Sequence, residues 1–253
     1  MNKRSGHTIW VRICHWLAAL SVIALMVSGY AMLMTNPNLY WGEVGNPLTP
    51  AFLELPVSKN FQHGGWSEPT PFFDTEDSPV TSNRGFEILN LNSWGRSLHF
   101  LMSWIFVITG CVYLVLGLLS GHFRRNLLPS AGELSSTAFW RDVKQHARFQ
   151  VSASDSGPPY GLLQKFAYCM ILFFIIPVIF LTGLTMSPSI TAAFPVLLDI
   201  FGGYQSARTI HFFAFVAMAL FLLVHILMVL LTGVGRQLRG MTLGLKLPDI
   251  EHD

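Results

Sequence analysis

Charged residues are scarce in this chain. Only 12% of its 253 residues are Asp, Glu, Lys or Arg, whereas 51% are hydrophobic. Soluble domains usually carry charge on about a quarter of their residues. The composition therefore excludes an ordinary soluble protein and predicts an integral membrane protein. We expect the lipid bilayer, and no nucleic acid, as a partner.

Cysteine is also rare, and no disulfide or metal-binding pattern uses it. The three cysteines, Cys14, Cys111 and Cys169, all lie in apolar segments and form neither C-x-x-C nor C-x-x-C-H. The first absence argues against a disulfide framework, and the second excludes covalent attachment of a c-type haem. We expect buried, reduced thiols.

The chain has no internal repeat and no low-complexity tract, so we expect a single domain over residues 1–253. Basic residues precede an apolar run near the N-terminus, as they do in a signal peptide. This run continues from residue 13 to about 34, which is too long for a signal peptide, and no A-x-A-like cleavage site follows it. We interpret it as a retained membrane span.

Long apolar runs, by contrast, are abundant. Four are close to the length of about 20 residues that a helix needs to cross a bilayer. They cover about 13–34, 98–119, 166–186 and 209–232. Uninterrupted runs of this kind predict helices rather than barrel strands. The expected fold is an all-α membrane bundle of four transmembrane helices, with a kink in the third span at Pro177.

Basic residues lie mostly on one side of these spans. Three precede the first span, six lie between the second and third, and three follow the fourth, which makes twelve of the 16 Lys and Arg residues. The opposite side holds Lys59, Arg84, Arg96 and Arg208. By the positive-inside rule, we expect both termini in the cytoplasm.

Two connecting segments are then expected outside. Residues 35–97 form a long loop rich in aromatic residues, which predicts a folded cap on the membrane interface. Residues 187–207 are apolar and contain prolines and a Gly-Gly pair, which predicts a short interfacial helix and a turn. Together the two segments suit docking of a partner; a self-contained lid is the alternative. On the inside, residues 133–150 predict a helix on the membrane surface.

Two histidines of the fourth span indicate a functional site. His211 and His225 are 14 residues apart (225 − 211 = 14). At about 100° per residue, both imidazoles leave nearly the same helix face, and at about 1.5 Å per residue they lie roughly 21 Å apart along the axis. An ionisable residue inside a membrane helix marks a functional site by default. The separation excludes one metal cluster and indicates two metal centres.

Antiparallel threading places two further histidines level with these. His15, near the start of the first span, matches the depth of His225. His99, near the start of the second span, matches the depth of His211. After this predicted orientation we name His15 and His225 the inner pair, and His99 and His211 the outer pair. Two imidazoles from different helices suit a six-coordinate haem iron, whereas zinc or copper requires three or four converging donors. Polar packing residues are the alternative.

Three arginines, Arg12, Arg96 and Arg208, each lie three residues before one of these histidines. Haem propionates are anionic and bind cations near the headgroups; snorkelling at the interface is the alternative role. Several glycines allow close approach of either a macrocycle or a neighbouring helix: Gly29, Gly110, Gly117 and Gly183. The remaining histidines are expected to be solvated: His7, His63, His122, His146 and His252.

Five motifs follow one another in a specific order. They are Arg12-Ile-Cys-His15-Trp, Ser28-Gly29-Tyr30, Trp94-Gly-Arg-Ser-Leu-His99-Phe, Gly121-His-Phe-Arg-Arg125 and Gln205-Ser-Ala-Arg-Thr-Ile-His211, the last followed by His225. This order resembles the bacterial di-haem cytochrome b561 superfamily over about residues 8–240. The chain looks most like the membrane cytochrome b subunit associated with thiosulfate reductase. That branch is related to the gamma subunit of formate dehydrogenase and to the b-type cytochrome of nickel-iron hydrogenase.

The resemblance implies a subunit of the bacterial inner membrane that passes electrons between the quinone pool and a periplasmic oxidoreductase. It implies two b-type haems, the inner one held by His15 and His225 and the outer one by His99 and His211. A molybdenum-cofactor enzyme is the implied partner. Quinone is expected beside the inner haem, although no residue identifies its pocket. No catalytic residue is expected in such an electron-transfer subunit, and the long loop over residues 35–97 departs from the shorter relatives.

Two other functions remain as alternatives. A stand-alone enzyme would oxidise superoxide or reduce a small periplasmic acceptor beside Arg96 and Arg208, although the acidic outer loop argues weakly against recruiting anions. A metal-ion or proton carrier would use the histidines as relay sites. The absence of carboxylates within the spans argues against this carrier, because proton relays usually include them.

Overall fold

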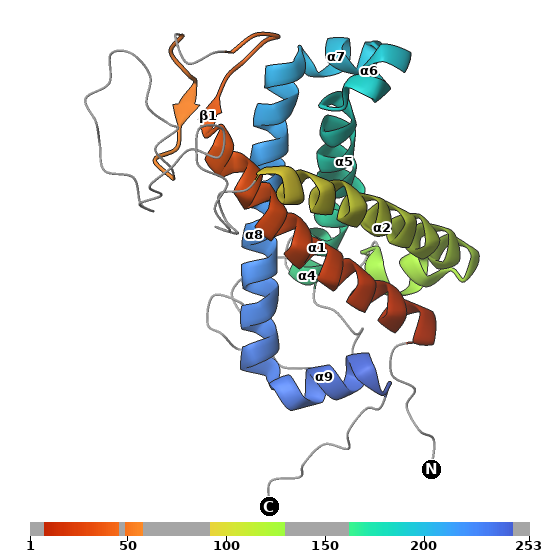
Figure 1. The fold of residues 1–253 in the computed structure, drawn as a ribbon. Helices are drawn as coiled ribbons and strands as arrows, with labels where there is room; N and C mark the ends of the chain where they lie inside the picture. Colours follow the sequence, from red (N-terminus) through yellow and green to blue (C-terminus); the bar gives the residue numbers. More distant parts are fainter. Residues whose placement is uncertain (1–7, 46–48, 58–91, 130–161, 245–253) are drawn as a thin grey trace, which may run out of the picture. The chain divides into compact units, whose positions relative to one another are not determined.

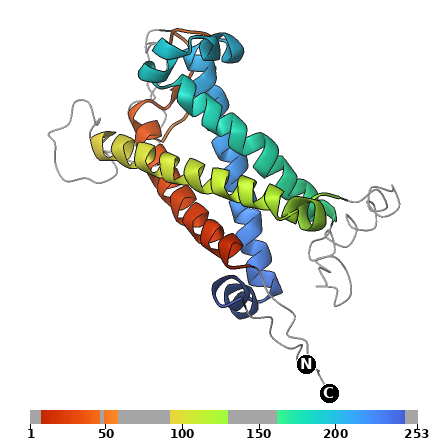
Figure 2. The same ribbon diagram turned by 90° about the vertical axis from the view of Figure 1, so that its right-hand side faces the viewer.

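The computed structural model describes residues 8–45, 49–57, 92–129 and 162–244, and this part contains the four predicted spans. The helices α1 (Ile9–Thr35), α2 (Asn92–Leu119) and α8 (Tyr204–Thr232) are continuous, as Figures 1 and 2 show. The third span covers Leu162–Thr185. The prediction of an all-α membrane protein with four spans is therefore confirmed, although each helix begins several residues before its predicted start.

The third span changes its helical geometry in the middle. It consists of α4 (Leu162–Met170), a π-helical stretch η3 (Ile171–Ile175) and α5 (Ile176–Thr185). Pro177 has no N–H to offer the carbonyl four residues before it, so regular α-helical bonding is interrupted at this point. The π-helical stretch ends two residues before this proline. The change of helical geometry lies beside Pro177, where a kink was predicted, and the kink itself stays a prediction.

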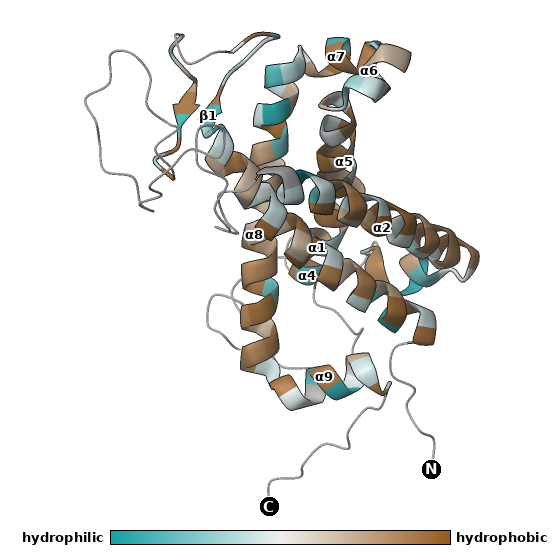
Figure 3. Cartoon of the chain, viewed as in Figure 1, coloured by the Kyte–Doolittle hydropathy of each residue, from teal (hydrophilic) through white to brown (hydrophobic). Residues whose placement is uncertain are grey.

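Many large apolar side chains on these helices are exposed. Leu118, Leu119 and Leu223, for example, are 70%, 81% and 65% exposed. Figure 3 shows the apolar character along the spans. Exposure of such surface to water would be unfavourable. Lipid tails are as apolar as leucine, so exposure of the same surface within a bilayer carries no such cost. The exposed apolar surface therefore supports a multi-pass membrane protein.

All three cysteines are free thiols, as expected. Only Cys14 is buried, however, while Cys169 is half-buried and Cys111 is exposed. The prediction of burial is therefore wrong for Cys111. Lying in an apolar segment is not the same as lying inside the protein, because one side of a membrane helix contacts lipid.

The chain forms two compact units, and all four spans contribute to both. Unit 1 comprises Met1–Ala18, Ile108–Ile175 and Met218–Asp253; unit 2 comprises Ala19–Val107 and Ile176–Ala217. The inner pair of histidines lies in unit 1 and the outer pair lies in unit 2. Each candidate site is therefore contained within one unit, and the expectation of a single domain stays a prediction.

Unit 2 contains short elements that precede and follow the spans. A two-stranded antiparallel sheet is formed by β1 (Asn38–Leu39) and β2 (Leu53–Glu54). The second outer segment contains two short helices, α6 (Pro188–Ala193) and α7 (Val196–Phe201), where one was predicted. The predicted turn lies at Gly202 and Gly203, whose positive φ values of 70° and 104° favour glycine.

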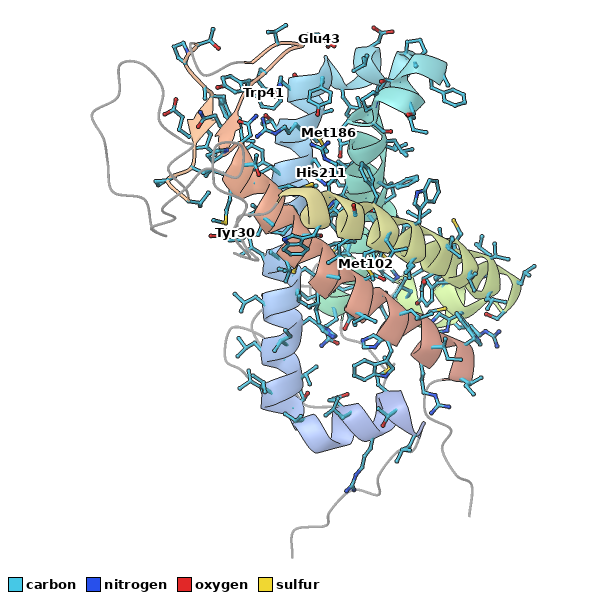
Figure 4. All side chains as sticks on the ribbon, in the orientation of Figure 1. Tyr30, Trp41, Glu43, Met102, Met186 and His211 are labelled. Carbon is cyan, nitrogen blue, oxygen red and sulfur yellow. The ribbon has the colours of Figure 1, made fainter. Side chains whose placement is uncertain are left out.

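The segment that follows α1 is bonded to the first turns of α8. Thr209, which is fully buried, donates through Oγ1 to the carbonyl of Tyr40 at 2.7 Å. The N–H of Gly42 donates to Oγ of Ser206 at 2.7 Å. The carboxylate of Glu43 accepts the first N–H of α8 at 3.1 Å, and Figure 4 shows Glu43 beside this helix end. An anionic side chain is stabilising at a helix N-terminus.

These bonds agree with the prediction of a folded cap for the described part of the first outer loop. Asp74, Glu76 and Asp77, which make the loop acidic, lie with the rest of residues 58–91 outside the described residues. The docking and lid alternatives are therefore both untested.

Unit 1 contains a helix that the sequence did not predict, α9 (Val234–Thr242). Arg12 donates from Nη1 to the carbonyl of Thr242 at 2.6 Å, and Trp16 donates from Nε1 to the carbonyl of Met241 at 3.1 Å. The last carbonyls of a helix have no partner within that helix, so donors from another element satisfy them. The first turns of α1 thereby hold the end of α9. The helix predicted over residues 133–150 lies outside the described residues.

Gly117 provides a test of packing in unit 1. Phe123, the first residue of the π-helix η2 (Phe123–Leu127), is 4% exposed. A Cβ added at Gly117 would lie 2.7 Å from Cε2 of Phe123, and closer still to Cζ. We expect Gly117→Ala to lower the free energy of unfolding by about 1–3 kcal/mol, as overpacking does. Thermal unfolding in detergent, followed by circular dichroism, measures this change.

Gly110→Ala is the matched control on the same helix, because a Cβ added at Gly110 meets no atom within 4 Å. It is expected to leave the unfolding temperature unchanged. Equal destabilisation by the two alanines would show that the contact with Phe123 is not the cause.

Candidate haem sites

The outer pair of histidines comes together in unit 2. His99 extends from α2 and His211 from α8, and their ring centres lie 6.3 Å apart with an angle of 58° between the ring planes. Figure 4 labels His211 on α8. Both imidazoles are half-buried. The two residues are thus close enough to act on one ligand.

Each outer imidazole contacts a buried hydroxyl on a neighbouring helix. Oγ of Ser28, on α1, lies 3.0 Å from Nδ1 of His99. Oγ1 of Thr182, on α5, lies 3.0 Å from Nδ1 of His211. Both hydroxyl residues are 0% exposed. A partner at Nδ1 fixes the orientation of a ligating imidazole.

A glycine follows each of these hydroxyl residues and lies against the same imidazole. A Cβ added at Gly29 would lie 3.4 Å from Cε1 of His99, and one added at Gly183 would lie 3.4 Å from Cε1 of His211. Each glycine therefore allows the imidazole to approach its helix closely. The sequence offered either a helix or a macrocycle as the neighbour of these glycines, and the structure places a histidine ring there.

The inner pair comes together in unit 1. The ring centres of His15, on α1, and His225, on α8, lie 6.3 Å apart with an angle of 54° between the planes. His15 also meets the ring of Trp16 edge-on at 5.3 Å, and His225 stacks against Phe221 at 5.9 Å. Each pair thus joins imidazoles from two different helices, at the same ring separation.

These separations fit an iron porphyrin. One metal ion held between two imidazoles, at a metal–nitrogen distance of about 2.0 Å, would separate their ring centres by about 6 Å. The ring separations of both pairs agree with this value. In the part of the chain that the structure describes, no three His, Cys, Asp or Glu side chains come together to hold a metal ion. A two-ligand haem site therefore fits the residues better than a zinc or copper site does.

Comparison with known sequences identifies the family. A sequence profile of the prokaryotic cytochrome b561 family matches residues 6–244. The chain belongs to this family. It is also 28% identical over 225 residues to the putative protein-methionine-sulfoxide reductase subunit YedZ1 of Azospira oryzae, which covers 89% of this chain and 90% of that protein. No solved structure matches the chain.

Cytochromes b561 bind b-type haem, so the chain is a membrane cytochrome b that takes part in electron transfer. The family match confirms the resemblance stated from the five motifs. The number of haems and the identity of the ligands remain predictions. The pairing of histidines from different helices is the structural observation that supports both.

The three predicted propionate-binding arginines have different surroundings in this cytochrome. Arg12 is half-buried and donates to the carbonyl of Thr242 on α9. Arg208 is half-buried and donates to the carbonyl of Asn36 and to Oε1 of Gln205. Arg96 is exposed. Two of the three arginines therefore already bond to protein atoms, and their role toward propionates stays a prediction.

One histidine expected to be solvated is instead part of an aromatic cluster in unit 1. The ring of His122 lies 5.4 Å from that of Trp10 and 6.2 Å from those of Tyr113 and Phe123. Its Nδ1 lies 3.0 Å from Nδ2 of Asn126. His122 is half-buried, so the expectation of solvation holds only in part. The other four, His7, His63, His146 and His252, lie outside the described residues.

Sequence reasoning did not assign a role to the two hydroxyl residues beside the outer pair. Ser28 belongs to one of the five motifs, and Thr182 belongs to none of them. The available pattern was a hydroxyl residue followed by glycine, present in two spans as Ser28-Gly29 and Thr182-Gly183. Serine and threonine within helices commonly bond their own backbone, so this pattern by itself does not indicate a site.

Proposed function

We propose that this cytochrome b carries two haems, each with two histidine ligands, and passes electrons across the bilayer between the quinone pool and a periplasmic redox partner. The observation that carries the proposal is the presence of two histidine pairs, each joining two helices at a ring separation of 6.3 Å. His15 and His225 would hold the inner haem, and His99 and His211 would hold the outer haem. When bound, haem supplies reversible one-electron chemistry.

The protein's own contribution is to hold and orient the ligands. Each pair would supply two imidazoles to one haem. The iron would then have no free position for a substrate, which suits electron transfer. The hydroxyls of Ser28 and Thr182 orient the outer imidazoles. The apolar, lipid-exposed helices around the ligands keep bulk water away from them.

A partner subunit is supported by the relative from Azospira oryzae, whose name describes it as a subunit of a reductase. The resemblance to thiosulfate reductase and formate dehydrogenase subunits supports a molybdenum-dependent partner. The distribution of basic residues supports cytoplasmic termini. The family resemblance supports a location in the bacterial inner membrane. The face that includes the first outer loop would then meet the partner.

Haem analysis of the purified chain tests the proposal. We expect a reduced-minus-oxidised spectrum of b-type haem and a pyridine haemochrome count of two haems per chain. A colourless protein, after expression with ample porphyrin supply, would contradict the proposal, as would a single haem. A lone chain that turns over superoxide or a small acceptor would favour the stand-alone enzyme, whereas an obligate co-purifying subunit would favour the conduit.

A further inference from the structure

The outer histidines share one local arrangement, built twice on different helices. In each case a fully buried hydroxyl residue and the glycine after it face one imidazole. Ser28-Gly29 of α1 faces His99, and Thr182-Gly183 of α5 faces His211. The repetition includes the distances, since both oxygens lie 3.0 Å from Nδ1 and both glycine Cβ positions lie 3.4 Å from Cε1.

The hydrogen bonds of each hydroxyl determine which imidazole nitrogen carries a proton. Oγ of Ser28 lies 2.7 Å from the carbonyl oxygen of Ala24, and Oγ1 of Thr182 lies 2.7 Å from the carbonyl oxygen of Val178. A carbonyl oxygen only accepts, so the single hydroxyl proton is donated to it. The hydroxyl oxygen can then only accept from the imidazole. Nδ1 of His99 and of His211 therefore carries the proton, and Nε2 has a lone pair available for iron.

We propose that Ser28 and Thr182 are positioning residues that select this tautomer and make the outer haem harder to reduce. The proposal rests on the proposed function, since it requires His99 and His211 to be iron ligands. A hydrogen bond from Nδ1–H to an acceptor raises the basicity of a ligating imidazole. A more basic ligand favours the ferric state, which has the higher positive charge. Loss of the acceptor therefore raises the midpoint potential of the outer haem.

Two other hydroxyl residues of the described helices bond to carbonyls of their own helix and, among the hydrogen bonds described, to nothing else. Thr185, also on α5 and also 0% exposed, donates to the carbonyl of Leu181 at 2.9 Å. Ser103, on α2, donates to the backbone carbonyl of His99 at 2.7 Å. Both residues make the same kind of bond to their own helix as Ser28 and Thr182 do. They provide matched controls, since neither has a hydrogen bond to an imidazole among those described.

Redox titration of the full-length, haem-loaded protein tests the proposal. We expect Ser28→Ala and Thr182→Val each to raise the midpoint potential of one haem and to leave the other unchanged. The outer haem is assigned as the one that His99→Ala removes. For the double variant the ratio of reduced to oxidised outer haem, at fixed ambient potential, is expected to rise about tenfold, and tenfold corresponds to 59 mV for one electron. Thr182→Ser keeps the hydroxyl and is expected to retain the wild-type potential.

The matched variants Thr185→Val and Ser103→Ala are expected to leave both potentials unchanged. Unchanged potentials in Ser28→Ala and Thr182→Val, with two haems retained, would overturn this proposal and leave the proposed function intact. A shift of both haems together would also overturn it, since this would indicate a general disturbance. Absence of haem from the wild-type protein would instead overturn the proposed function. If Thr182→Val loses the outer haem, haem binding by Thr182→Ser becomes the test. Because this variant keeps the hydroxyl, its failure to bind the outer haem would contradict a role for the hydroxyl.

Discussion

Replacing His211 by alanine is expected to reduce the haem content from two per chain to one. The ring centres of His99 and His211 lie 6.3 Å apart, and we propose that these two residues hold one haem. Removal of either residue would leave that haem with one imidazole in place of two. In the described residues no third His, Cys, Asp or Glu joins either pair, so none of these residue types is in place to substitute for the lost imidazole. The pyridine haemochrome count, with protein concentration determined independently, measures this loss.

The other histidine variants sharpen this test. His99→Ala is expected to remove the same haem as His211→Ala, whereas His15→Ala and His225→Ala are expected to remove the other. The two classes of variant should differ in the midpoint potential of the haem that remains. His122→Ala is the control, because His122 lies in an aromatic cluster and belongs to neither pair. If all four single changes removed one and the same haem, the proposed pairing would be wrong.

If His99 and His211 hold a haem on the periplasmic side, as we propose, loss of that haem is expected to abolish electron delivery to the periplasmic face. In right-side-out vesicles, a membrane quinol supplies electrons and external ferricyanide, which does not cross the bilayer, accepts them. One quinol gives up two electrons and two protons and reduces two ferricyanide ions. We expect the wild-type protein to reduce ferricyanide and the His99→Ala variant to fall to the rate of vesicles without the protein. Absorbance of ferricyanide measures the rate.

Inverted vesicles from the same cells provide the control and test the orientation. Here ferricyanide contacts the cytoplasmic face, so a haem held by His15 and His225 would still be able to reduce it in His99→Ala. Activity is therefore expected to persist in inverted vesicles and to be lost in right-side-out vesicles. The reverse pattern would place the termini in the periplasm, and equal loss on both faces would argue against a sequential path through two haems.

The spans and the histidine pairs were the features that the sequence predicted best. Apolar length locates a membrane helix because the thickness of the bilayer sets it. The pairing of His15 with His225 and of His99 with His211 followed from depth alone, since antiparallel helices of similar length bring equal depths together. The structure brings these same residues together. Their role as iron ligands awaits the haem measurements.

The features that the sequence did not predict depend on which side of a helix faces the protein. Thr182 and Thr185 are both threonines in the same apolar span, so the sequence does not distinguish them. Only the direction of the Thr182 side chain brings it to His211. Cys111 is exposed for the corresponding reason, since an apolar neighbourhood does not distinguish lipid from protein.

Helix α9 contains two glycines in nine residues, which lowers its intrinsic helical preference, and bonds from α1 compensate for this.

The continuity of α8 from Tyr204 to Thr232 limits how this chain can change over evolution. One inserted or deleted residue between positions 211 and 225 would rotate everything beyond it by about 100°. Either His211 would then turn away from His99 or His225 would turn away from His15, even if every original side chain were kept. Substitutions of one apolar residue by another on the lipid side leave this angular phase intact. We therefore expect related sequences to vary in the types of residue between these two histidines and to preserve the number of residues between them.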